Sequence, residues 1–141
     1  MVYRHILVPI DGSQPSFNAL EAGIKMAIEQ GSILTALYVV PKVGQLVQVF
    51  AIKDVKDAFY QEGENIMDKA REMANSMNFK LSVRIKEGTP HKIIIETAQA
   101  LDCDLIVMGN QGRSGPSKLL IGSCTQRVLA GAPCPVLVVR E

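Results

Sequence analysis

Five short segments rich in β-branched residues alternate with longer amphipathic segments, and this alternation restricts the fold more than any other feature of the chain. The short segments span residues 5–10, 33–40, 81–87, 104–109 and 135–140. Four of them are apolar almost throughout, as expected for strands of a parallel sheet that is covered on both faces. The third, LSVRIKE, alternates apolar and polar residues instead, which is typical of a strand at the edge of a sheet.

The segments between these strands carry helical signals. Helices are expected over about residues 17–28, 55–77, 89–101 and 123–130. Gly31 ends the first pattern, and Thr89 followed by Pro90 is a common start signal for the third helix.

The resulting order, β-α-β-α-β-α-β-α-β, predicts an α/β fold. We expect a three-layer open sheet of five mostly parallel strands, joined by right-handed crossovers. A chain of 141 residues has the size of one domain with one core, so a single domain over residues 1–141 is expected. Residues 41–50 form the one irregular segment, and the sequence leaves open whether it is a flap or a partner surface.

Composition and charge argue against several classes of protein. The net charge is +1 and aromatic residues make up 5% of the chain, so there is neither a basic footprint for nucleic acid nor a set of stacking platforms. No apolar run approaches the roughly 20 residues that span a bilayer, and the amino terminus lacks the layout of a signal peptide. Cys103, Cys124 and Cys134 show no CxxC spacing, which predicts reduced thiols. We expect a cytoplasmic protein that binds neither nucleic acid nor membrane.

Two of the predicted strands are followed directly by polar or glycine-rich residues. The first runs into PIDGS, which places Asp11 just past its end, and the fourth runs into GNQGRSGPSKLLIGS. Open parallel sheets bind ligands at the carboxyl ends of strands where the strand order reverses. If these two strands are neighbours, Asp11 faces the glycine-rich loop. Asp11 could instead cap the first helix, but contact with a ligand hydroxyl or a metal is the favoured interpretation.

The loop after the fourth strand is dense in glycine, with Gly109, Gly112, Gly115 and Gly122 in fourteen residues. Glycines weaken regular structure, but they let backbone N–H groups converge on an anion. Gly122 and Ser123 begin the last helix, where unpaired N–H groups and the helix dipole favour negative charge. Ser123 can cap this helix or donate its hydroxyl to a phosphate. We therefore expect a polyphosphate ligand, in a loop that is not a Walker motif because no GK[ST] follows the glycines.

Taken together, the segments HILVPIDGS, GNQGRSGPSKLLIGS and APCPVLVVR resemble the universal stress protein family, in its ATP-binding branch. The nucleotide motif of that family is Gly, two residues, Gly, nine residues, Gly, then Ser or Thr. Gly109, Gly112, Gly122 and Ser123 match it at every position. The resemblance covers the whole chain and implies a Rossmann-like sheet of order 3-2-1-4-5, the adenine nucleotide alpha hydrolase-like fold.

The resemblance also implies roles for individual residues. Asp11 would contact the ribose or the Mg²⁺ or Mn²⁺ that accompanies the phosphates. The backbone of Val39 would bond the adenine, and Met108 and Gly109 would line the ribose. The phosphates would be held by the loop and the start of the last helix, at Gly112, Gly122 and Ser123.

The family typically forms homodimers through its last strand, which here offers Val136, Leu137, Val138, Val139 and Arg140. The expected function is that of a dimeric, ATP-binding regulatory module of the stress response. Two alternatives stay open: a slow ATPase or phosphotransferase, in which Asp11 orients water through the metal, and a relative that prefers AMP or cyclic AMP. No catalytic residue is assigned, because hydrolysis needs a second polar group with an evident role.

Overall fold

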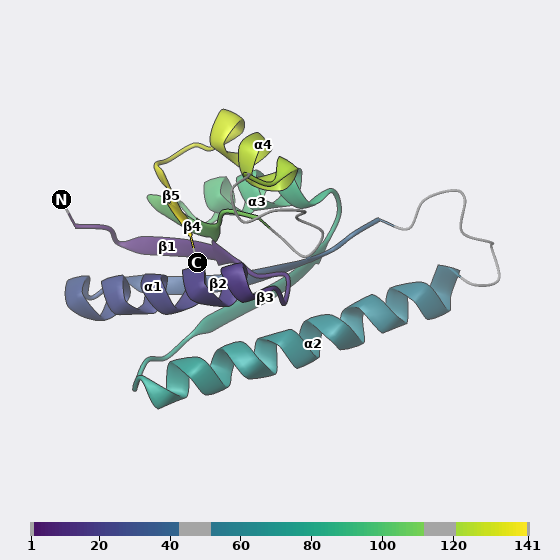
Figure 1. Cartoon of the computed structure of the whole chain (residues 1–141), viewed down its shortest axis with the longest axis horizontal. Helices are drawn as coiled ribbons and strands as arrows, with labels where there is room; N and C mark the ends of the chain where they lie inside the picture. Colours follow the sequence, from purple (N-terminus) through teal and green to yellow (C-terminus); the bar gives the residue numbers. More distant parts are fainter. Residues whose placement is uncertain (1, 43–51, 112–120, 141) are drawn as a thin grey trace.

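The computed structural model describes residues 2–42, 52–111 and 121–140 of the chain. Strands and helices alternate along it as the sequence predicts (Figure 1). The elements are β1 (His5–Pro9), α1 (Gln14–Gln30), β2 (Ile33–Val40), α2 (Ile52–Ser76), β3 (Ser82–Glu87), α3 (Pro90–Ala100), β4 (Leu105–Gly109), α4 (Ser123–Gly131) and β5 (Val136–Val139). Each strand lies within its predicted segment.

The five strands form one sheet in the order β3-β2-β1-β4-β5, and all four strand pairs are parallel. This confirms the order that the family resemblance implies. β3 is an edge strand, as its alternating pattern predicts, and β5 is the other edge. Because β1 pairs with β2 on one side and with β4 on the other, the strand order reverses between β1 and β4, where a ligand of such a sheet is expected.

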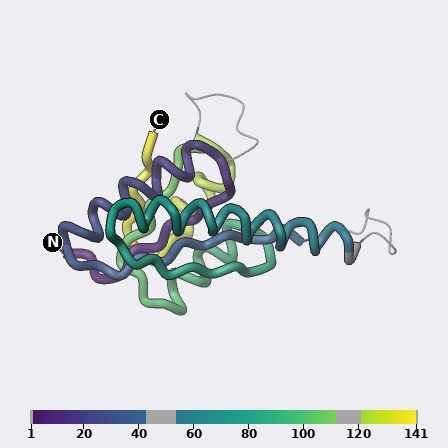
Figure 2. The backbone as a smooth tube through the Cα atoms, turned by 90° about the horizontal axis from the view of Figure 1, so that it is seen from below, coloured from purple at the N-terminus to yellow at the C-terminus, as the bar shows by residue number. Residues whose placement is uncertain are grey.

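Two pairs of helices cover the two faces of the sheet (Figure 1). α1 and α2 lie side by side over one face, as the view from below shows (Figure 2). In the core, Val8 packs with Ile24 of α1 on this face, and its neighbour Leu7 packs with Ile94 of α3 and Val128 of α4 on the other. Successive side chains of a strand point to opposite faces. A central strand between two helical layers is therefore apolar at most of its positions.

The ends of α1 and α3 follow the signals in the sequence. Gly31 adopts a left-handed conformation, with φ of 71°, directly after α1. Thr89 is the N-cap residue of α3 and Pro90 is its first residue, although the Thr89 side chain makes no capping bond. None of the helices in the described ranges is long and apolar enough to cross a bilayer.

Candidate functional site

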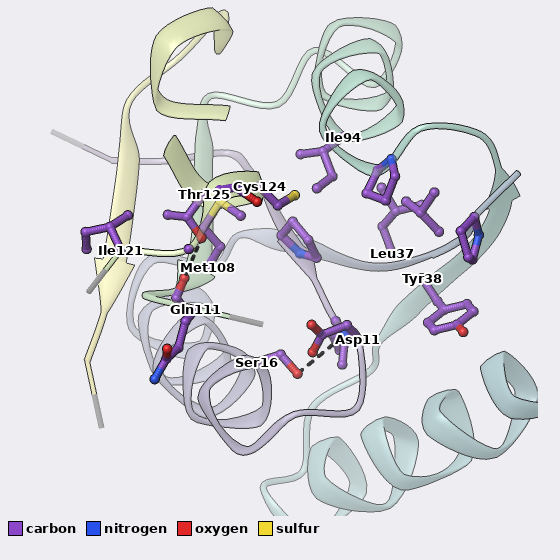
Figure 3. Close-up of a pocket in the computed structure, with 18 of the residues that line it drawn as sticks. Asp11, Ser16, Leu37, Tyr38, Ile94, Met108, Gln111, Ile121, Cys124 and Thr125 are labelled. Carbon is purple, nitrogen blue, oxygen red and sulfur yellow. Dashed lines mark hydrogen bonds between the residues drawn. The ribbon is translucent and has the colours of Figure 1, made fainter. Parts of the chain in front are cut away.

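A cavity of about 590 Å³ lies at the carboxyl ends of β1, β2 and β4. This volume falls within the usual range of small-molecule sites. The β1–α1 turn and the first turn of α4 form part of its wall, and side chains from α2 and α3 complete it. In the close-up, Asp11 lies on one side of the cavity, while Cys124 and Ile94 lie on the opposite side (Figure 3).

The structure brings most of the predicted site residues to this one cavity. Six of them line it, namely Asp11, Val39, Met108, Gly109, Gly122 and Ser123. Gly112 lies outside the described residues, as do residues 43–50 of the irregular segment. The six residues come from the turn after the first strand, the second strand, the fourth strand and the start of the last helix, so the strand order is what brings them together.

Asp11 is held by a network of short-range hydrogen bonds in the β1–α1 turn. Its Oδ1 accepts from the Ser13 N–H at 2.9 Å, and its own N–H donates to the Ser16 hydroxyl at 3.4 Å. The cap of α1 is Ser13, whose hydroxyl accepts from the Ser16 N–H at 3.3 Å. The alternative role of Asp11 as the helix cap is therefore wrong. The turn instead fixes the carboxylate at the wall of the cavity.

Val39 presents its main chain to the cavity, because β2 continues beyond the end of β1. The last bond between the two segments is the one from the Ile10 N–H to the Leu37 carbonyl, at 2.8 Å. In a strand, residues two apart direct their N–H and C=O groups to the same neighbouring strand. The N–H and C=O groups of Val39 therefore point in the same direction as those of Leu37, toward the side of β1. Consistently, the Val40 carbonyl accepts from the Gly88 N–H on the other side, at 2.9 Å. One donor and one acceptor of Val39 thus face the space past β1, and this pair is complementary to the polar edge of a purine.

The first turn of α4 forms the opposite end of the cavity wall. The N-cap residue is Gly122, with φ of −64° and ψ of 157°, and Ser123 is the first helical residue. The prediction that Ser123 caps this helix is therefore wrong by one position. Since a glycine cap has no side-chain oxygen, it leaves the first-turn N–H groups, including those of Ser123 and Cys124, to an external acceptor. The helix dipole favours an anion at the same place.

Gly122 and Gly109 serve the site in different ways. The Gly122 N–H donates to the Asn110 carbonyl at 2.7 Å, so Gly122 lines the cavity without offering its own N–H to a ligand. Gly109 ends β4 against α1, where an added Cβ would lie 2.8 Å from the backbone carbonyl carbon of Pro15. Close packing of a strand on a helix therefore requires the glycine at position 109, whatever the ligand.

The apolar wall of the cavity was missed by reasoning from the sequence. Pro90 and Ile94 of α3, Leu37 of β2 and Phe59 of α2 all line the cavity (Figure 3 labels Leu37 and Ile94). In the sequence these residues are indistinguishable from core positions, because their spacing within each element is the ordinary one. Only the sequence Thr-Pro at the start of α3 gave any signal, by placing a helix terminus near the strand ends.

Electrostatic effects couple the two sides of the cavity. Burial raises the pKa of the Cys124 thiol, and the negative charge of Asp11 raises it further. Burial also raises the pKa of Cys103, to about 12. The three cysteines, these two and Cys134, carry free thiols, as predicted. A thiol with a raised pKa stays protonated at neutral pH, so Cys124 presents an uncharged side chain to the cavity.

An open parallel sheet with a cavity at its topological switch point, flanked by a helix terminus that favours anions, defines a Rossmann-like α/β domain. The chain belongs to the universal stress protein family, whose family model matches residues 2–140.

Universal stress protein MJ0531 of Methanocaldococcus jannaschii is 36% identical over 143 residues, which cover 99% of this chain and 84% of that protein. The solved structure of universal stress protein UspA from Lactobacillus plantarum superposes with a TM-score of 0.90 at 30% identity, covering 99% of each chain. A universal stress protein solved in complex with cAMP has a TM-score of 0.76 at 23% identity, also covering 99% of each chain. Nucleotide complexes thus occur among proteins of this fold.

Proposed function

We propose that this protein is an adenine-nucleotide-binding regulatory module of the stress response and that its ligand is ATP. The observation that supports this most directly is the pairing of two features on one cavity. The main chain of Val39 offers a donor and an acceptor at one end, and the first turn of α4 offers N–H groups at the other. A nucleotide needs both, since its base forms directional bonds and its phosphates carry the negative charge.

In this proposal the ligand lies across the ends of β1 and β4. The adenine bonds to Val39 and packs against the apolar wall at Ile94, and the ribose lies beside Met108 and Gly109. The phosphates meet the first turn of α4, at Gly122 and Ser123, and the loop residue Gly112. The size of the cavity allows this arrangement, because its volume of about 590 Å³ is within the range that encloses ligands of drug-like size.

Asp11 is the acidic side chain in the described wall of the cavity, and we assign it to the ribose or to a phosphate-bound Mg²⁺ or Mn²⁺. No group of three His, Cys, Asp or Glu side chains gathers anywhere in residues 2–42, 52–111 and 121–140. A cation at Asp11 would therefore take its other ligands from phosphate oxygens and water, as Mg²⁺ commonly does in nucleotide sites. The residues present fit a cation that arrives with the nucleotide.

The proposal favours nucleotide binding over efficient hydrolysis. Rapid hydrolysis requires a positioned water and stabilisation of the charge that develops on the γ-phosphate. In the described wall, Asp11 is the one carboxylate that could orient water, and Ser123 offers a neutral hydroxyl. A module that holds ATP and responds to its presence fits these groups better than a fast ATPase. Reduced thiols fit a cytoplasmic location, which stays a prediction.

Titration calorimetry with ATP, GTP, AMP and cyclic AMP, each with and without Mg²⁺, tests the proposal. We expect ATP to bind most tightly and GTP to bind at least about tenfold more weakly, because guanine presents a different pattern of donors and acceptors. ATP that is recovered from the protein should be intact, as expected of a protein that binds ATP without hydrolysing it efficiently. Tighter binding of AMP or cyclic AMP would contradict the assignment of ATP, and steady turnover that disappears in Asp11→Ala would show an enzyme instead.

We also propose a homodimer through β5. The two edges of the sheet differ in a way that supports this: β3 carries Arg84 and Lys86, whereas β5 consists of four apolar residues, from Val136 to Val139. Charged residues protect an edge strand from pairing, and an apolar edge invites it. Pairing of two β5 strands, with Arg140 at the end of each, is closed by a two-fold axis.

Leu137→Lys is expected to convert the proposed dimer to a monomer. Leu137 is 41% exposed on the β5 edge, and a lysine there places like charges near each other across the two-fold axis. Light scattering at micromolar concentration measures the mass. Ser82→Lys, on the exposed edge strand β3, is the matched control and should leave the mass unchanged. A wild-type protein that is already monomeric would refute the dimer.

A further inference from the structure

Thr125 lies in the first turn of α4 and makes a hydrogen bond that leaves the helix. Its hydroxyl donates to the carbonyl oxygen of Gly109, at the end of β4, with a donor–acceptor distance of 3.0 Å (Figure 3). The side chain is 3% exposed. A threonine within a helix usually turns its hydroxyl back to a carbonyl of the preceding turn. Here the partner belongs to the strand that forms the floor of the cavity.

A second bond joins the same two segments. The Gly122 N–H donates to the Asn110 carbonyl at 2.7 Å. The two consecutive carbonyls at the end of β4, those of Gly109 and Asn110, are thus both occupied by the first turn of α4. Because the two donors are three residues apart, they lie on one helical turn. A single bond would let the helix pivot about it, whereas two bonds fix both its position and its rotation about its own axis.

The strand end that receives these bonds is itself fixed. An added Cβ at Gly109 would lie 2.8 Å from the carbonyl carbon of Pro15, so this residue is in close contact with the first turn of α1. Pro15 is buried. The Gly109 carbonyl oxygen therefore has a fixed position relative to the cavity. The hydrogen bond from Thr125 fixes the start of α4 relative to this oxygen.

We infer that Thr125 is a positioning residue that aims the first-turn N–H groups of α4 at the phosphates of a nucleotide. This inference rests on the proposed function and adds a residue outside the glycine motif. The direction of the Ser123 and Cys124 N–H groups depends on the rotation of α4 about its own axis. A hydrogen bond weakens steeply as its angle departs from linearity, so this rotation affects how strongly the two groups bind a phosphate. The bond also occupies the Gly109 carbonyl, an acceptor that would otherwise repel phosphate oxygens at the cavity.

Thr125→Val tests this inference because valine matches threonine in shape but lacks the hydroxyl. We expect the ATP affinity measured by calorimetry to fall about tenfold, the usual effect of losing one buried hydrogen bond. Amide hydrogen exchange at Gly122 should accelerate by a similar factor, since its bond to Asn110 depends on the same placement. Thr125→Ser should restore both quantities nearly to wild-type values, because it restores the donor.

Thr97→Val is the matched control. Thr97 is completely buried on α3, and its hydroxyl has no hydrogen-bond partner among the described residues, so this variant should change neither ATP affinity nor exchange at Gly122. A folded Thr125→Val protein with wild-type affinity would overturn the inference, as would a Thr125→Ser protein no better than Thr125→Val. If wild-type protein binds no nucleotide, the proposed function fails. Hydrogen exchange then still decides whether Thr125 positions the helix, and equal exchange in Thr125→Val and wild type would refute it.

Discussion

Gly122→Val is expected to abolish ATP binding while the chain stays folded. The φ of −64° at Gly122 is one that any residue adopts, so valine brings no backbone strain. Its branched side chain would, however, fill the space beside the first turn of α4, where the phosphates are proposed to bind. Losing about two charge-assisted bonds there weakens binding by roughly a hundredfold or more. Calorimetry measures the affinity, and far-UV circular dichroism reports the fold.

Two further variants, at positions 122 and 123, separate this steric effect from other causes. Gly122→Ala should bind ATP with an intermediate affinity, because its single methyl group takes up less of the space. Ser123→Ala removes a hydroxyl but leaves the backbone donors, so its loss should be smaller than that of Gly122→Val, about tenfold at most. A folded Gly122→Val protein with unchanged affinity for ATP would refute the placement of the phosphates at α4.

Gly109→Ala is expected to destabilise the whole domain, although it adds only one methyl group. The new Cβ would lie 2.8 Å from backbone atoms of Pro15, and a backbone cannot move aside as the end of a side chain can. Overpacking of this kind costs about 1–3 kcal/mol, and the thermal midpoint should fall by several degrees. Thermal and urea unfolding, followed by circular dichroism, measure the change in the free energy of unfolding.

Gly31→Asn is the control for this variant. Gly31 has a φ of 71° and no atoms within 4 Å of an added Cβ, and asparagine tolerates that conformation better than other side chains. Its free energy of unfolding should therefore stay within about 0.5 kcal/mol of the wild-type value. If Gly109→Ala were as stable as Gly31→Asn, the close contact between β4 and α1 would not be what requires glycine at position 109.

These two predictions separate the roles of glycines that the motif treats alike. The spacing of Gly109, Gly122 and Ser123 matches the nucleotide motif of the family, and the resemblance assigns both glycines to the nucleotide, Gly109 to the ribose and Gly122 to the phosphates. In the structure, Gly109 is required by the packing of a strand on a helix, whereas Gly122 caps α4 at the wall of the cavity. A motif records which residue type is needed at a position, but several physical reasons can require the same type.

The order and type of the elements were predictable because their signals are local. Apolar runs of strand length, helical periodicity, and the signals at Gly31 and Thr89 all act over a few residues. The errors were also local and had identifiable causes. α1 begins at Gln14, ahead of the first apolar residue of its pattern, because Ser13 caps it and a helix cap, unlike a buried face, needs no apolar residue. α4 is capped by Gly122 and not by Ser123, since the chain there is still extended at residue 122.

The amino-acid sequence by itself determined the α/β class, and its motif spacing pointed to the family and to a polyphosphate near the fourth strand. The tertiary structure alone decided which surfaces meet around the cavity. It directed the main chain of Val39 past the end of β1, brought Ile94 over the strand ends, and joined Thr125 to Gly109. The reason is one of range: periodicity and helix caps depend on interactions within one or two turns, whereas these arrangements depend on strands pairing and helices docking between segments far apart in the sequence.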